Sequence, residues 1–237
     1  MPRTLHPAPD GLAGVMFARL CPRPGRITQA DVCCDLVWRG ERLYLSGPQS
    51  EARPSQSVGQ DIQVLNLDPV VAQAWLGIPL SELRDRQAPL AEIAPHAAGP
   101  LEELFHAGEA ASLVRPEGVS AAFVLDRRAS VAAQVLRRSG SVRRAAESVG
   151  LSERQLERLF GERFGLPPKR YATILRMRRA VALAKDGASL AGAAVEAGYG
   201  DQAHFNRDVR ILSGRTPLTL LPHVGDFQYV RARTRDY

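Results

Sequence analysis

An α+β fold is predicted for this chain of 237 residues, with a small β-containing N-terminal module followed by an all-α domain. Two helix-turn-helix units joined by a linker helix are expected to form that second domain. Three observations predict this division. Short β-prone runs lie in the first third of the chain, apolar residues at helical spacing dominate the second half, and one helical pattern occurs there twice, 48 residues apart.

The composition is that of a globular protein, with 45% hydrophobic and 24% charged residues, which argues against disorder. The apolar stretch Gly11–Leu20 is too short to span a bilayer and is interrupted by Arg19. It also lacks a signal-peptide cleavage pattern, so we expect a cytoplasmic protein with no membrane partner. Three cysteines cannot all pair within one chain, and we expect no disulfide framework.

The N-terminal module, residues 1–115, is expected to hold a hairpin, a third strand and three helices. Leu36–Trp38 and Leu43–Leu45 are β-prone runs on either side of the turn Arg39-Gly40-Glu41. The other expected elements follow in chain order: a loop at Pro48–Gln60, a strand at Asp61–Leu67, helices at Pro69–Leu76 and Ser81–Arg86, with Ser81 as the N-cap of the second, and an acidic helix around Leu101–Ala111. A break at Pro116-Glu117-Gly118 ends the module.

The all-α domain is expected over residues 119–224, followed by a basic tail over residues 225–237. The first helix-turn-helix unit covers 141–164, the linker helix 169–185 and the second unit 189–212. The expected helices are Val119–Arg138, Ser141–Val149, Ser152–Phe164, Lys169–Lys185, Ser189–Ala197 and Asp201–Leu212.

The repeated pattern is specific. A Ser and an aliphatic residue lead to two alanines and then to a glycine, Gly150 in the first copy and Gly198 in the second. Each copy closes on a Gly-x-x-Pro sequence, which begins at Gly165 and at Gly214. A turn glycine between a helix of small residues and a second helix with a polar face is the helix-turn-helix layout, in which the second helix enters the major groove of DNA. Two units in one chain predict contact with two grooves of double-stranded DNA.

Charge supports this prediction independently. Residues 1–125 hold ten Arg and no Lys against fourteen acidic residues, a net charge of −4. Residues 126–237 hold twenty-one basic residues against eleven acidic ones, a net charge of +10. A basic field on a helical domain is expected of a nucleic-acid-binding protein. A solvated basic surface without a partner is the alternative.

In the first unit, Ser152 is the expected N-cap, and Gln155 completes a capping box. The apolar positions of this helix face the core, which leaves Arg154, Glu157 and Arg158 on the opposite face. Arg158 is suited to a bidentate contact with guanine, and Arg154 to guanine or phosphate. Glu157 either accepts a hydrogen bond from cytosine or, as we favour, forms an intrahelical salt bridge with Arg154 or a nearby arginine.

In the second unit, Asp201 takes the N-cap role. Gln202 and Asn206 carry amides suited to adenine, Ala203 can meet a thymine methyl group, and Arg207 is the counterpart of Arg158. His204 either contacts phosphate or is an ordinary surface histidine. The predicted DNA-binding residues are therefore Ser152, Arg154, Glu157, Arg158, Gln202, Ala203, His204, Asn206 and Arg207.

The sequence resembles the AraC/XylS family of bacterial transcription regulators. The resemblance covers roughly Val119 to His223 and is most specific at Gly150-Leu151-Ser152 and at Gly198-Tyr199-Gly200-Asp201 with the residues that follow. It implies a seven-helix domain whose two recognition helices enter successive major grooves, promoter recognition, and contact with RNA polymerase. A linker helix of about 17 residues, roughly 25 Å long, fits units placed near one DNA turn apart.

The second unit departs from the family pattern. Ala193 and Val209 stand where the family usually has larger residues, and Gly192 lies inside a helix. Each change lowers core volume or helix propensity. We therefore expect the second unit to be the less stable one.

The N-terminal module resembles, more weakly, the short β-containing module that precedes this domain in some such regulators and to which a sensing role is attributed. The resemblance implies a small-molecule effector there. The adjacent thiols Cys33 and Cys34 could bind a soft metal or arsenic(III) with Cys21. We favour the simpler interpretation, small buried residues entering a strand, and predict no metal site and no cofactor.

Two other functions stay open from the sequence. DNA-repair alkyl-acceptor enzymes join a reactive cysteine module to a similar DNA-binding domain, but the three cysteines are too few for a four-thiolate zinc cluster. An architectural DNA-bending protein without promoter specificity is the other alternative. We predict a regulator without catalytic residues, and the sequence leaves open whether it activates or represses.

Overall fold

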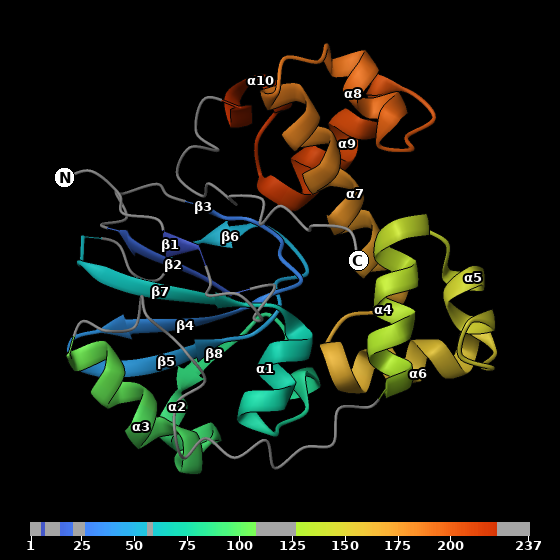
Figure 1. Cartoon of the computed structure of the whole chain (residues 1–237). Coiled ribbons are helices and arrows are strands. Elements are labelled where there is room, and N and C mark those ends of the chain that lie inside the picture. The colour runs from blue at the N-terminus through green and yellow to red at the C-terminus, as the bar shows by residue number, and fades with distance from the viewer. Residues whose placement is uncertain (1–5, 8–14, 21–26, 56–58, 108–126, 222–237) are drawn as a thin grey trace.

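A computed structural model describes residues 6–7, 15–20, 27–55, 59–107 and 127–221. Its N-terminal region is built on a six-stranded antiparallel sheet in the order β1-β2-β7-β4-β5-β8 (Figure 1). The bounds are β1 His6–Pro7, β2 Val15–Leu20, β4 Cys34–Arg39, β5 Arg42–Ser46, β7 Ile62–Leu67 and β8 Gln87–Pro89. A separate two-stranded sheet pairs β3, Ile27–Thr28, with β6, Arg53–Pro54.

The predicted hairpin is confirmed, with Leu36 paired to Leu45 and Trp38 paired to Leu43. Gly40 and Glu41 both have positive φ, 54° and 64°, as a tight primed turn requires. The predicted third strand is confirmed as β7, which lies between β2 and β4. Side chains alternate along β4, so that Leu36 joins the hydrophobic core of the N-terminal region and Val37 lies on the opposite face of the sheet.

Helices cover one face of this sheet (Figure 1). The helix predicted at Pro69–Leu76 is found as α1 with the same bounds, and the Asp68 carboxylate caps it by accepting from the Val70 N–H at 2.9 Å. The other helices of the region are the 3₁₀ helix η1 Leu80–Leu83, α2 Leu90–Ile93 and α3 Pro95–His106. The acidic helix is thus α3, which begins earlier than expected, and residues 108–111 of that prediction lie outside the described residues.

The helix predicted at Ser81–Arg86, with Ser81 as its N-cap, is wrong. The chain forms the 3₁₀ turn η1 instead, and it has no side-chain cap. Asp85 adopts a φ of 58°, which lies in the left-handed region, so a right-handed helix cannot continue through it. Its carboxylate accepts from both the N–H and the hydroxyl of Ser50 at 2.6 Å, so a contact with a distant loop replaces the last helical turn.

Seven helices follow in the described part of the C-terminal domain: α4 Arg127–Ser139, α5 Val142–Glu147, α6 Glu153–Phe164, α7 Pro168–Lys185, α8 Leu190–Glu196, α9 Gln202–Ser213 and α10 Pro217–Leu220. The predicted helices of both units and the linker helix are confirmed within one or two residues at each end. For the opening helix, residues 119–126 lie outside the described residues, as do the predicted boundary near residue 116 and the tail 225–237. No helix that the structure describes combines the length and apolar character needed to cross a bilayer.

One hydrophobic core joins both helix-turn-helix units through α7. Phe160 and Phe164 of α6 pack against Tyr171 of α7, with ring centroids 5.5 and 5.8 Å from the tyrosine ring. Ala30 and Val32 of the N-terminal region belong to the same core. The helical domain is therefore packed around residues from both halves of the chain.

Candidate DNA-binding site

The start of α6 is fixed by the capping box that the sequence predicts. Ser152 Oγ accepts from the Gln155 N–H at 3.2 Å, and Gln155 Oε1 accepts from the Ser152 N–H at 2.9 Å. These bonds satisfy two of the unpaired donors at the end of a helix. The cap sets where the helix begins and hence which residues face outward.

Arg154, Glu157 and Arg158 are exposed on α6, as predicted from the spacing of its apolar residues. Leu156 and Phe160 of the same helix are fully buried. No ion pair joins Glu157 to Arg154 or to any other residue that the structure describes, so the intrahelical pairing that we favoured is not formed. The Glu157 carboxylate is therefore exposed and unpaired among the described residues.

The second unit presents an equivalent surface on α9. Asp201 Oδ1 caps the helix by accepting from the His204 N–H at 2.6 Å. Gln202, Ala203, Asn206 and Arg207 are exposed, as predicted. Arg158 and Arg207 both lie in the second turn of their helices, six residues after the N-cap, so the two units present a guanidinium at the same position.

His204 is half-buried, and its ring packs edge-on against Tyr199 at 5.0 Å between centroids. Its Nε2 lies 3.8 Å from Asp208 Oδ2. The side chain thus faces a cluster within the protein, which matches the ordinary-histidine interpretation more closely than the phosphate contact.

That cluster attaches α9 to the linker helix α7 and was not predicted. Arg176 of α7 donates to Asp208 Oδ2 at 3.3 Å, and its guanidinium lies 4.3 Å from the centre of the Tyr199 ring. Burial raises the pKa of the Tyr199 phenol, and the Asp208 carboxylate adds to that rise. A cation–π contact combined with an ion pair in a partly buried place holds α9 at a defined angle to α7. The sequence did contain a signal for this cluster, since Asp208 is the one acidic residue within α9, a helix that also carries Arg207 and Arg210.

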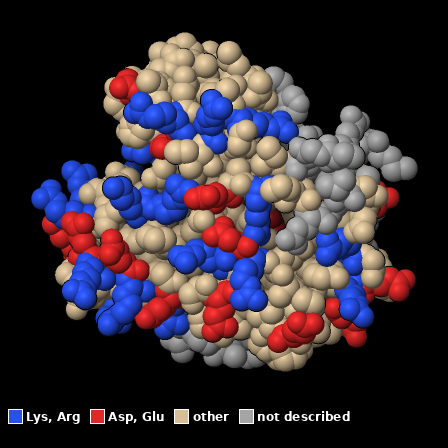
Figure 2. Space-filling view, turned by 180° about the vertical axis from the view of Figure 1, so that it is seen from behind, with Lys and Arg blue, Asp and Glu red and all other residues tan. Residues whose placement is uncertain are grey.

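Basic side chains gather in bands over one face of the molecule, with acidic ones among them (Figure 2). Part of this charge is paired: Arg143 lies 3.8 Å from Glu147, and Arg170 lies 3.7 Å from Glu51. Arg154, Arg158 and Arg207 have no such partner in the part of the chain that the structure describes. Together with the exposed Arg210 of α9, they are the arginines of α6 and α9 whose charge is left unpaired among the described residues.

Comparison with known proteins agrees with this geometry. Residues 145–222 match a family model described as a helix-turn-helix domain. The C-terminal domain is an AraC-type helix-turn-helix domain. A search of curated proteins found no match.

Solved structures similar to this chain include AraC-type regulators. A transcriptional regulator from Chromobacterium violaceum with an AraC-type DNA-binding domain is 28% identical, covering 40% of this chain and 90% of that one, with a TM-score of 0.38. Apo ToxT from Vibrio cholerae is 11% identical, covers 88% of this chain and 97% of that one, and has a TM-score of 0.50. The second likeness shows the fold alone: a region containing a sheet followed by the helical domain. The AraC-type domain supports a DNA-binding transcription regulator.

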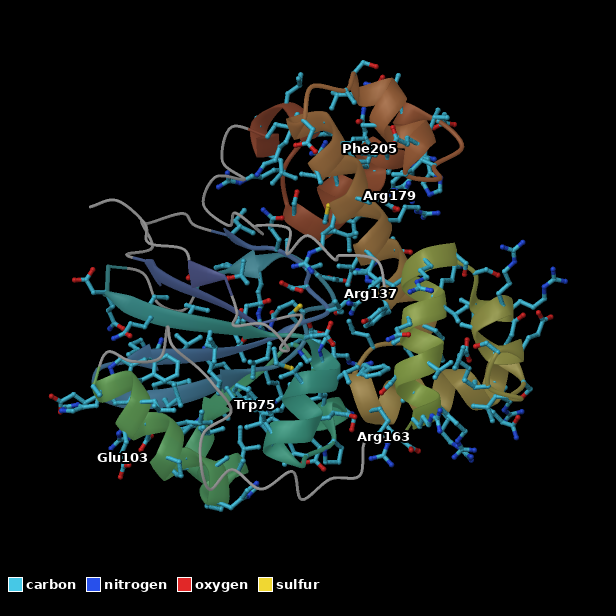
Figure 3. The ribbon with its side chains drawn as sticks, in the orientation of Figure 1. Trp75, Glu103, Arg137, Arg163, Arg179 and Phe205 are labelled. Atoms are coloured by element: carbon cyan, nitrogen blue, oxygen red, sulfur yellow. The ribbon has the colours of Figure 1, made fainter. Side chains whose placement is uncertain are left out.

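Besides the partly exposed Arg170–Glu51 pair, two shorter ion pairs that sequence reasoning missed join this AraC-type domain to the N-terminal region. Arg137 of α4 lies 2.5 Å from Asp68 Oδ2 and donates to the Tyr171 hydroxyl at 3.0 Å. Figure 3 shows Arg137 directed from α4 toward the N-terminal region. Arg178 of α7 lies 2.5 Å from Asp31 Oδ2. Burial raises the pKa of the Tyr171 phenol to about 12, so it stays a neutral donor and acceptor between the two halves. No local sequence pattern marks these pairs, because their members lie 69 and 147 residues apart.

Cys33 and Cys34 are packed within the N-terminal region. Cys34 is fully buried at the start of β4, and Cys33 is partly buried beside Asp31 and Arg178. Burial raises the pKa of both thiols well above the ordinary value. A thiolate is the nucleophile and the metal ligand, so this environment disfavours alkyl transfer and soft-metal binding at Cys33 and Cys34. Cys21 lies outside the described residues.

Proposed function

We propose that this protein is a sequence-specific transcription regulator that inserts α6 and α9 into successive major grooves of promoter DNA. One observation carries the proposal: two capped helices expose their N-terminal halves, and each presents an arginine in the same register, at the two ends of a shared linker helix. The N-terminal residues of a recognition helix are those that meet base edges. Ser152, Arg154, Glu157, Arg158, Gln202, Ala203, Asn206 and Arg207 form the proposed contact surface.

The test starts from selection of bound sites out of random DNA, followed by binding of single-base variants of the selected site. Arg158→Ala is expected to relax specificity in one half of the site and Arg207→Ala in the other, each by about 1 to 3 kcal/mol at the affected base pairs. Arg84→Ala, an exposed arginine of the N-terminal region, is the matched control and should leave the base preferences as they are. Unchanged preferences in both recognition-helix variants would show that these arginines do not face the bases.

The same selection separates a regulator from an architectural protein. A specific site should outcompete random DNA by about a thousandfold or more at fixed salt. Comparable binding to both would favour the bending protein.

We further propose contact with RNA polymerase and a small-molecule effector at the N-terminal region. Transcription from the selected promoter with purified polymerase, with and without cell metabolites, tests both.

A further inference from the structure

The two recognition helices end in the same way, and the N-terminal region contacts both ends. Gly165 after α6 and Gly214 after α9 have φ of 68° and 67°, the left-handed conformation that closes a helix. The last carbonyls of a helix lack partners within it. The Arg163 carbonyl of α6 accepts from the Gln73 side-chain amide of α1, and the Leu212 carbonyl of α9 accepts from the Ala30 N–H at 2.7 Å.

These two carbonyls are equivalent positions of the repeat, since each lies two residues before the closing glycine. The glycines themselves are also covered. A Cβ on Gly165 would lie 2.5 Å from the Leu80 carbonyl oxygen, and a Cβ on Gly214 would lie 3.2 Å from the Ile27 side chain. The N-terminal region therefore packs against the C-terminal end of each recognition helix, while the N-terminal halves stay exposed. Figure 3 shows Arg163 at the end of α6 that lies nearest α1.

The N-terminal region also links the end of α9 to the end of α6 through a second set of contacts. The segment that carries Ala30 is bridged to the loop at Gln49 by two backbone hydrogen bonds, of 2.8 and 3.0 Å. The neighbouring Pro48 packs against Gly165. Asp31 adds an attachment to the middle of the linker helix through Arg178. A short path of backbone hydrogen bonds, completed by the packing of Pro48 on Gly165, thus runs outside α7 from the end of α9 to the end of α6.

We propose that Gln73, Ala30 and Asp31 are positioning residues that fix the distance and angle between α6 and α9, and thereby determine which half-site spacing the protein accepts. This inference rests on the proposed function. One inserted base pair moves the second half-site by about 3.4 Å and rotates it by about 34° about the DNA axis. If α6 and α9 are held both by α7 and by the N-terminal region, they cannot follow that movement. If α7 alone held them, they could adjust as α7 bends.

The experiment measures binding to the selected site and to versions lengthened or shortened by one and two base pairs between the halves. The intact protein should lose at least about tenfold in affinity per inserted or deleted pair, which is about 1.4 kcal/mol. The double variant Gln73→Ala, Asp31→Asn should lose less than about threefold per pair. Glu51→Gln is the matched control, because Glu51 is a 72% exposed partner of Arg170 at the same interface. It should keep the steep dependence of the intact protein.

The outcomes separate the two claims. A footprint over a single groove contradicts the proposed function. A footprint over two half-sites with equal affinity at all spacings, or with the same steep dependence in the intact and the double variant, overturns the positioning role. Circular dichroism establishes that each variant is folded. If the double variant unfolds, Gln73→Ala alone decides, because it removes one hydrogen bond at the end of α6 and must still flatten the spacing dependence.

Discussion

The stability of this protein is expected to fall as the pH rises from about 4 to about 7, because of one partly buried carboxyl group. Asp35 lies in β4 opposite Asn66 of β7, whose amide donates to it at 2.6 Å. Burial raises the pKa of the Asp35 carboxyl to about 7 from an ordinary value of 3.8, and the nearby Asp31 carboxylate adds to the rise. The folded protein therefore holds a proton at Asp35 that the unfolded chain releases near pH 4.

The sign and size follow from proton linkage. Between the two pKa values the folded state binds one proton more than the unfolded state, so the free energy of unfolding decreases by about 1.4 kcal/mol for each pH unit. Over the interval the loss amounts to at most about 4 kcal/mol. The stabilisation is fully present below pH 4 and has gone above pH 7.

Urea unfolding of the intact protein and of Asp35→Asn at half-unit steps from pH 4 to pH 8 tests this. Asparagine keeps a neutral partner for Asn66, so the variant should lack this component of the pH dependence. The difference in free energy between the two proteins should change by several kcal/mol, with the intact protein losing stability as the pH rises. Asp61→Asn, an exposed carboxylate before β7, is the control. Parallel curves for the intact protein and Asp35→Asn would show that the Asp35 carboxyl is solvated and ionised throughout.

Three further outcomes are expected. Ser152→Ala should lower the free energy of unfolding by about 1 kcal/mol through loss of the α6 cap, measured by urea titration, and an unchanged midpoint would contradict the capping role. Phe160→Ala should lower it by about 3 to 5 kcal/mol, because the ring is fully buried and lies 4.8 Å from Phe164; a loss under about 1 kcal/mol would show that the core collapses around the gap. Amide protons of the second unit, with Gly192 and the small core residue Val209, should lose hydrogen-exchange protection before those of the first, and equal protection in both would refute the weaker core.

Much of the C-terminal domain could be predicted because its signals are local. An N-cap, a capping box and an apolar stripe act within one or two turns, and Ser152, Gln155 and Asp201 behave as their types and spacing indicate. The hairpin at Gly40 is equally local, since a two-residue turn fixes the register of its strands.

The failures have long-range causes. Ser81 has the type and spacing of an N-cap, but contacts of Asp85 with a loop 35 residues away turn the chain out of the helix. The strands β1, β2, β3, β6 and β8 went unpredicted, and β6 lies within the predicted loop Pro48–Gln60. Four of them are only two or three residues long, too short to show the alternation of a strand, and β2 was taken only as an apolar stretch. Gln73 offered one faint signal, a polar side chain in the otherwise apolar helix α1, and its partner lies 90 residues away.

The opposite charges of the two halves of the chain pair some arginines across the interface between them and leave others exposed. The acidic N-terminal region supplies Asp31 and Asp68 to arginines of the basic domain, so part of the charge of +10 is neutralised inside the protein. These pairs lie at α4 and α7, whereas the exposed arginines of α6 and α9 are left unpaired among the described residues. Each phosphate contact adds about −0.9 to the slope of log affinity against log salt concentration. The measured slope should therefore correspond to far fewer phosphate contacts than the domain has basic residues. The paired Arg137 and Arg178 attach α4 and α7 to the N-terminal region, whereas Arg154, Arg158 and Arg207 are the unpaired arginines that we propose to contact DNA.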